Sequence, residues 1–475
     1  MKTTDTLDDY IGVKIPGTHF QTTSLYLLCL LVVINTCFAT ITDNVLPAVQ
    51  KEYYLTDLQA SIISGFSNAG SIIGVIIANL LWQKVGPMRT LKLSLLVPFL
   101  FVYIIYFTEG FYLCFFGWVI QSLALSIGDI PISVYLAETA PVKSRGRWTV
   151  AFGISATFGR ITSTLLSNFL INEDSISSWK NPLYAHSVLY AIVSIPIFFY
   201  FQESLRYLYA NKKHEEFVIS INRIIKINQK KIDKNVSVDL ATIDEVKSLS
   251  EDNSKPLEEK QTAKSQFKEL FGKKYFSLTI VLGLVWISLV AHFAGFGIIL
   301  SFWFDKYGNV NKYLFMGLTY SSEFIAMATI YFMIDNERFG RKKSMQIFST
   351  LSCILYGTNF FIKNQTIVTG FFFLERFCMK STVILLNTYT SEIFPTRLRN
   401  IGMSFNNIST SIFAAFLPLV VISLFHWYDY SVILLFFASA ASFLFLSFFM
   451  WRDRTKRSLD LTKSMISAGE RVSLK

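Results

Sequence analysis

Twelve long apolar segments constrain the fold of this chain more than any other feature of its sequence. A helix that crosses a bilayer needs about 20 consecutive apolar residues. Six such segments precede residue 202, near 25–47, 58–82, 90–107, 111–137, 149–171 and 187–201. Six more follow residue 275, near 276–304, 313–334, 344–362, 366–390, 401–425 and 430–451. The sequence therefore predicts an all-α membrane protein with twelve transmembrane helices in two pseudo-symmetric six-helix bundles.

The composition agrees with a protein that lies in lipid. Hydrophobic residues make up 52% of the chain and charged residues only 16%, whereas a soluble domain carries about 25% charge. The formal net charge is +11, but the basic residues form short clusters between apolar segments rather than one continuous face. All five cysteines lie inside apolar segments without metal-ligand spacing. We therefore expect no nucleic-acid partner, no metal and no cofactor.

The distribution of Lys and Arg predicts the orientation of the chain. Short loops on the cytoplasmic side of a membrane carry an excess of basic residues. The basic clusters fall in the even-numbered loops, which share one side with both termini and the central loop. The predicted regions are a cytoplasmic N-terminus (1–24), a first six-helix bundle (25–201), a cytoplasmic central loop with short helices (202–275), a second bundle (276–451) and a cytoplasmic tail (452–475). The expected location is a plasma membrane or an intracellular vesicle membrane.

One short element recurs after the fourth segment of each half. It reads Glu138-Thr-Ala-Pro-Val-Lys-Ser-Arg145-Gly146 in the first half and Glu392-Ile-Phe-Pro-Thr-Arg-Leu-Arg399 in the second. A carboxylate and a guanidinium at this spacing can form a charge-assisted pair that latches the halves while the cytoplasmic side is closed. The alternative is an ordinary surface ion pair, worth about 0–1 kcal/mol. Internal repeats of this kind place a substrate site near the bilayer midplane, between the halves.

Two further elements resemble those of a known superfamily. Glu337-Arg338-Phe-Gly340-Arg341-Lys, between the eighth and ninth segments, is similar to the signature loop of the major facilitator superfamily. Gln-Glu203-Ser-Leu-Arg206-Tyr-Leu, after the sixth segment, resembles an element shared by its sugar porters and organic ion transporters. The resemblance implies a transporter that works by alternating access, and not an enzyme. The expected gating residues are Glu138, Arg145, Gly146, Glu203, Arg206, Glu337, Arg338, Gly340, Arg341, Glu392 and Arg399.

Within that superfamily the chain is most similar to the branch of organic ion transporters and synaptic-vesicle-glycoprotein-related proteins. The similarity lies at residues 17–21, 128–131, 267–271 and 322–323. The Gln-Gln signature of sugar porters is absent from the seventh segment, where 291–297 reads Ala-His-Phe-Ala-Gly-Phe-Gly. We therefore expect a secondary active or facilitative transporter of a small polar organic solute, such as an organic ion or a related metabolite. A hexose or polyol porter is the alternative, and a non-transporting vesicle or receptor-like scaffold is an alternative of a different class.

Ionisable residues inside the apolar segments predict the functional site, because each costs about 2.5–3.5 kcal/mol on membrane-insertion scales. Asp129 and Arg160 occur in the first half, and Glu323 and Arg376 in the second. A rise of about 1.5 Å per residue places Asp129 and Arg160 close to the midplane, where they could meet. Each half thus has an acid and a base. They are either internal ion pairs that fix the helices, or groups that meet a charged solute or carry a proton.

The complete set of solute and coupling candidates includes neutral hydrogen-bonding residues. His292, alone on an apolar segment, is more typical of a core histidine than of a coupling residue. The candidates are Asp129, Arg160, Glu323, Arg376, Lys380, His292, Asn387 and Asn407. The expected partners are a small-molecule solute, the lipid bilayer and the proton as a candidate coupling ion. The chain is expected to be a monomer.

Overall fold

Every regular element that the structure describes is a helix. This computed structural model describes residues 11–450, except 12–13, 16–18, 97–110, 140–144, 173–174, 230–239, 244, 247–262, 308–310, 334–339, 363 and 395. The long helices are α2 (His19–Glu52), α3 (Asp57–Val85), α5 (Phe111–Thr139), α6 (Arg145–Leu170), α7 (Lys180–Tyr200), α12 (Phe276–Tyr307), α13 (Lys312–Met333), α14 (Gly340–Asn359), α15 (Gln365–Ile393), α16 (Thr396–Trp427) and α17 (Asp429–Phe448). The short ones are η2 (Ile176–Trp179), α8 (Leu205–Ala210), α9 (His214–Gln229) and α11 (Ala263–Leu270).

The long helices correspond to the predicted spans. Eleven of the twelve apolar segments coincide with described helices. The third segment begins as helical residues 87–96 and then continues outside the described part of the chain. Within the described residues, six helices meet a strict criterion of length and apolarity for crossing a membrane. Others, such as α15 with 29 residues, are long enough but carry charged side chains.

Contacts divide the chain into two compact units. The first contains Met1–Ala39, Gly70–Thr162 and Lys180–Lys260, and the second contains Thr40–Ala69, Ser163–Trp179 and Gln261–Lys475. The boundary passes through α2, α3 and α6, so one end of each helix belongs to the second unit. These contact-based units therefore differ from the sequence-based bundles.

Helix ends from the first half pack against α16 within the second unit. The Asn68 amide of α3 donates to the carbonyl oxygen of Ala414 at 3.3 Å. The Ser61 hydroxyl lies 3.4 Å from the carbonyl oxygen of Pro418. Pro418 lies inside α16 and lacks a backbone N–H, so the carbonyl oxygen of Ala414, four residues earlier, has no helical donor. The Asn68 amide supplies a donor to this carbonyl. The α3–α16 contact is therefore polar as well as close.

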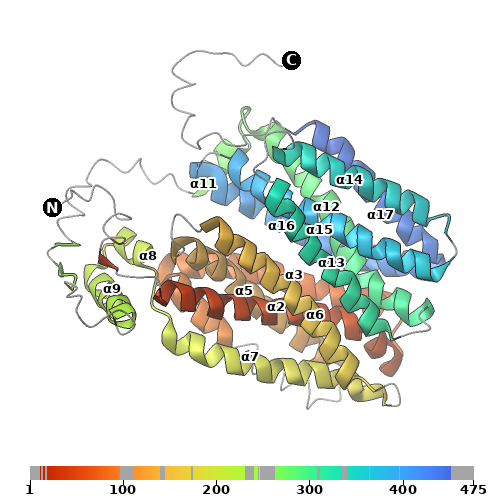
Figure 1. Ribbon diagram of the computed structural model, residues 1–475, viewed down its shortest axis with the longest axis horizontal. Helices are drawn as coiled ribbons and strands as arrows, with labels where there is room; N and C mark the ends of the chain where they lie inside the picture. Colours follow the sequence, from red (N-terminus) through yellow and green to blue (C-terminus); the bar gives the residue numbers. More distant parts are fainter. Residues whose placement is uncertain are drawn as a thin grey trace. The chain divides into compact units, whose positions relative to one another are not determined.

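The outer surfaces of the helices are apolar. Large side chains such as Phe169, Phe199, Phe332 and Phe361 are between 70% and 82% exposed. Exposed apolar surface on this scale is unfavourable in water and suits contact with lipid tails. The second unit has an apolar core formed by α12, α14, α15 and α17, which lie side by side in Figure 1.

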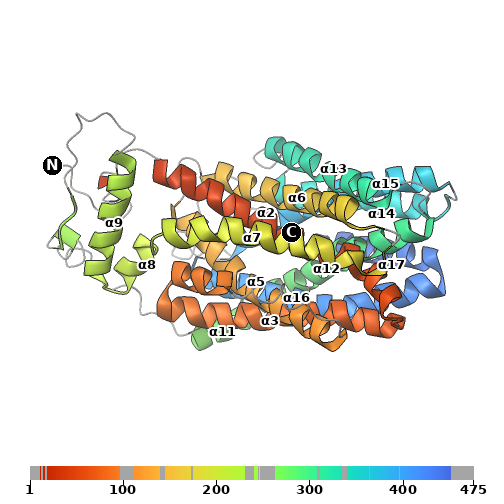
Figure 2. The same ribbon diagram turned by 90° about the horizontal axis from the view of Figure 1, so that it is seen from below.

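The short helices α8 and α9 lie at the end of α7 in both views (Figures 1 and 2). The apolar face of α9 is fully buried at Phe217, Ile221 and Ile225, at the helical spacing present in the sequence. It packs with Phe20, which precedes the first span, in one cluster. The Phe20 backbone N–H also donates to the Asn228 side chain at 2.7 Å. These helices are thus attached to the start of α2.

Candidate functional site

Three charged side chains form a buried cluster in the second unit, which we call the ion triad. Arg376 of α15 donates from Nε to Glu323 Oε1 of α13 at 2.8 Å, and its Nη2 lies 2.7 Å from the same oxygen. Lys380 Nζ lies 3.2 Å from Glu323 Oε2. Glu323 is fully buried, and the two basic side chains are 3% and 9% exposed. Charges this deep are tolerated because they are paired.

The helices explain why the triad forms. Arg376 and Lys380 are four residues apart on α15, so they lie on one face of the helix. That face packs against α13, which carries Glu323. The guanidinium also lies over the rings of Phe293 and Tyr320, at 4.2 and 5.0 Å from their centroids. Aromatic faces stabilise a cation at such distances, and they hold Arg376 in one position.

Charge in the triad does not cancel within it. Two cations and one carboxylate give one net positive charge. A second carboxylate, Asp43 of α2, lies within electrostatic range of Arg376. Asp43 also approaches α12 closely, because a Cβ added to Gly297 would lie 3.6 Å from Asp43 Oδ2. Asp43 was not among the sequence candidates, although an Asp inside an apolar segment was a visible signal.

In the first unit, the described hydrogen bond of Asp129 involves Asn35. The Asn35 amide of α2 donates to Asp129 Oδ1 of α5 at 2.8 Å. Asp129 is exposed although it lies well inside α5, whereas Asn35 is buried. Arg160 of α6 is half-buried. Its pairing with Asp129 stays a prediction, and Asn35 is a partner that the sequence analysis did not select.

The remaining solute candidates occupy different environments. His292 of α12 is buried, and its Nδ1 lies 3.1 Å from the carbonyl oxygen of Ser288, one turn earlier in the same helix. This geometry is typical of a core histidine. Asn387 of α15 and Asn407 of α16 are both exposed. Their contact with a polar solute stays a prediction.

Among the gating candidates, Glu203 has the most clearly defined contacts. Its carboxylate accepts the backbone N–H groups of Met88 and Arg89, each at 3.0 Å. These donors belong to the first turn of helical residues 87–96, where N–H groups lack partners in the helix and favour a negative charge. Gly86 has a φ of +102°, and a Cβ there would lie 2.6 Å from Glu203 Cδ. Only glycine fits this position without strain.

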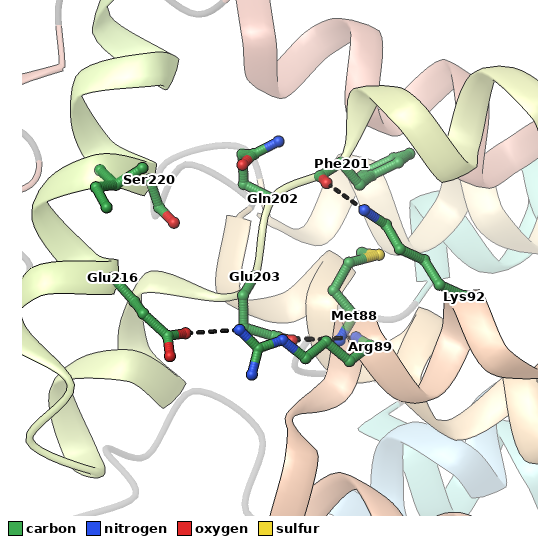
Figure 3. Close-up of a pocket in the computed structure, with 9 residues that line it drawn as sticks. Met88, Arg89, Lys92, Phe201, Gln202, Glu203, Glu216 and Ser220 are labelled. Carbon is green, nitrogen blue, oxygen red and sulfur yellow. Dashed lines mark hydrogen bonds and ion pairs between the residues drawn. The ribbon is translucent and has the colours of Figure 1, made fainter.

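A second set of contacts joins the same loop to α8 and α9. Arg89 Nη2 lies 2.7 Å from Glu216 Oε2 (Figure 3). The Tyr207 hydroxyl donates to the Lys84 carbonyl oxygen at 2.9 Å, and partial burial raises the pKa of this phenol. A cavity of about 240 Å³ lies between the loop and α9. We call the contacts of Glu203, Glu216 and Tyr207 with residues 84–89 the loop clamp.

The other gating candidates are placed less fully. Arg206 is half-buried on α8, Gly340 begins α14 with a φ of +57°, and Arg341 is buried. Glu337 and Arg338 lie outside the described residues. The structure places the backbone but not the side chains of Glu138, Arg145, Gly146, Glu392 and Arg399 at helix ends. Both proposed latches therefore stay predictions.

Comparisons with known proteins give a consistent picture. A sequence model of the Major Facilitator Superfamily matches residues 28–335 and 314–469. The organic cation/carnitine transporter 7 of Arabidopsis thaliana is 24% identical over 82% of this chain and 83% of its own length. The synaptic vesicle 2-related protein of Xenopus laevis is 22% identical over 75% of this chain and 64% of its own length. The xylose transporter XylE of E. coli, in an inward open structure, matches 94% of this chain and 100% of its own with a TM-score of 0.68 and 14% identity.

Proposed function

The chain belongs to the Major Facilitator Superfamily, and we propose from its buried charges that it transports a small organic solute that bears a carboxylate. As a member of this superfamily it is a multi-pass membrane transporter and not an enzyme. This agrees with the fold and the superfamily predicted from the sequence. The identity of the solute, its site and the coupling mechanism belong to the proposal.

The ion triad is the observation that carries the proposal. Arg376 and Lys380 share one carboxylate, Glu323, and Asp43 supplies a second one nearby. The planar guanidinium of arginine matches a carboxylate with two parallel hydrogen bonds. A solute carboxylate that replaces Asp43 near Arg376 would keep the local charge balanced. An anionic or zwitterionic solute fits this requirement.

The alternatives fit the triad less well. Relatives of the chain include proteins named as sugar transporters, but a neutral sugar needs hydrogen bonds rather than a buried guanidinium and ammonium. A scaffold without transport has no use for charges that are costly to insert. The relatives named for organic cations and anions agree with a charged solute. A hexose or polyol porter remains the second candidate.

The mechanism that we propose is alternating access with both termini in the cytoplasm. The positive-inside distribution of Lys and Arg supports this orientation. The loop clamp supports a role for Glu203 in conformational change, because it ties the segment after the sixth span to the loop after the second. We propose the proton as the coupling ion and the monomer as the transporting form.

The test is uptake by purified protein in liposomes over a panel of organic anions, zwitterions, cations and hexoses. We expect accumulation of solutes with a carboxylate and little competition by hexoses. Arg376→Lys keeps the charge but removes the planar fork, so it should lower uptake strongly. Lys273→Gln removes an exposed charge and serves as the matched control. Hexose uptake that Arg376→Lys leaves unchanged would contradict the proposal.

A further inference from the structure

A second acidic group lies inside the second unit, on a different face of α15. Glu375 is fully buried, and neither of its carboxyl oxygens has a hydrogen-bond partner among the described residues. Asn359, the last residue of α14, is also fully buried, and within the same part of the chain neither of its amide atoms has a partner. Buried polar atoms without partners are rare and require an explanation. Here four of them lie on two packed helices.

The two side chains face each other without a direct hydrogen bond. Asn359 is close enough to act on the Glu375 carboxyl, but neither side chain reaches hydrogen-bond geometry. Tyr356 also lies within electrostatic range of Glu375, yet its hydroxyl points to Met379 Sδ at 3.8 Å. The site is therefore polar but incomplete as described.

No cation of the triad neutralises Glu375. Successive residues on a helix are about 100° apart, so Glu375 and Arg376 point in different directions. Arg376 and Lys380 are both paired with Glu323 on the α13 side. A buried carboxylate that is ionised without a paired cation is far more costly than the neutral acid. This environment therefore favours the protonated form of Glu375.

Within the described residues, thiols and a phenol surround Glu375. Tyr356 and Cys378 lie within its electrostatic range, and Cys353 lies next to Tyr356. On α12, His292 is bonded to its own helix. Residues 401–425 of α16 contain no ionisable side chain. A proton on Glu375 is therefore the simplest way to neutralise the negative charge of this buried carboxylate.

We propose that Glu375 and Asn359 form a buried proton-binding site, separate from the ion triad, and that this site carries the coupling proton. The first part rests on the geometry alone, and the coupling role rests on the proposed transport function. The site would hold its proton while α14 and α15 are packed together. It would release the proton when that contact admits water.

Infrared spectroscopy tests the proton directly, on protein in nanodiscs without solute. We expect the carbonyl band of a protonated carboxyl group in the wild type and its loss in Glu375→Gln. Glu215→Gln, which changes an exposed carboxylate outside the loop clamp, is the matched control and should keep the band. Asn359→Leu should shift the band without removing it. An unchanged band in Glu375→Gln would overturn the claim that Glu375 holds the proton. An unshifted band in Asn359→Leu would overturn the claim that Asn359 belongs to the proton-binding site.

Thermal unfolding and uptake provide two further readouts. The folded protein holds a proton that the unfolded chain releases at neutral pH, so wild-type stability should fall as pH rises, and Glu375→Gln should remove part of this fall. Uptake by Glu375→Gln should lose its dependence on a pH gradient. Unchanged dependence would overturn the coupling role. The spectra and unfolding need no solute, so they stand even if the proposed solute class is wrong.

Discussion

Asp129 and Glu323 are both acidic residues well inside long helices, but their surroundings differ. Asp129 is exposed and accepts a hydrogen bond from a neutral amide, that of Asn35. Glu323 is fully buried between two cations, Arg376 and Lys380. An exposed carboxylate can exchange one partner for water at small cost, whereas a buried one depends on its partners. We infer that the second half binds the charged group of the solute and that Asp129 contributes less to solute binding.

The largest loss of stability is expected from Glu323→Gln, which disrupts the buried ion triad. The substitution leaves Arg376 and Lys380 buried without a carboxylate between them. Removing one partner of a buried ion pair costs about 3–5 kcal/mol. Thermal unfolding in detergent should show a large drop in the midpoint. A midpoint within error of the wild type would mean that the triad is not buried as described.

A smaller effect is expected from Asn35→Leu in the first half. The change keeps the size of the side chain but removes the donor to Asp129 Oδ1. Because Asp129 is exposed, water can replace the donor, and the loss should be about 1 kcal/mol. The same unfolding assay measures it. A loss as large as that of Glu323→Gln would show that Asp129 depends on Asn35 as Glu323 depends on its cations.

The smallest effect is expected from Asp129→Asn. The amide oxygen of the new side chain can still accept from Asn35, and the exposed site does not require a charge. Stability should change by less than about 1 kcal/mol. Uptake should fall only modestly. A collapse of folding in this variant would instead favour the predicted ion pair between Asp129 and Arg160, and Arg160→Gln should then restore stability.

The sequence predicted the fold well because lipid imposes a simple rule on composition. Runs of apolar residues located the spans, and the resemblance at Glu337–Lys342 and Gln202–Leu208 predicted the superfamily. The sequence analysis placed an acid, Glu323, and a base, Arg376, inside the apolar segments of the second half, and the structure brings them into contact. The depth of a residue along a helix can be obtained from the sequence by counting residues.

It was harder to predict which neighbouring helix each side chain faces. The sequence did not indicate that Asn35 faces Asp129, or that Asp43 approaches Arg376. Both depend on how α2 packs against its neighbours, and an isolated apolar helix has no pattern that fixes this. The loop clamp was missed for a similar reason, because the contact of Glu203 with Met88 and Arg89 joins residues more than a hundred positions apart.

The most direct test of the central claim compares solute binding by Arg376→Lys and Asp129→Asn in parallel. Binding of the best carboxylate-bearing solute from the uptake panel is measured by titration calorimetry on the purified protein. We predict that Arg376→Lys weakens binding at least about tenfold, equivalent to about 1.4 kcal/mol, and that Asp129→Asn changes it by less than about threefold. The reverse order, with Asp129→Asn the weaker binder, would contradict the assignment of charge recognition to the second half.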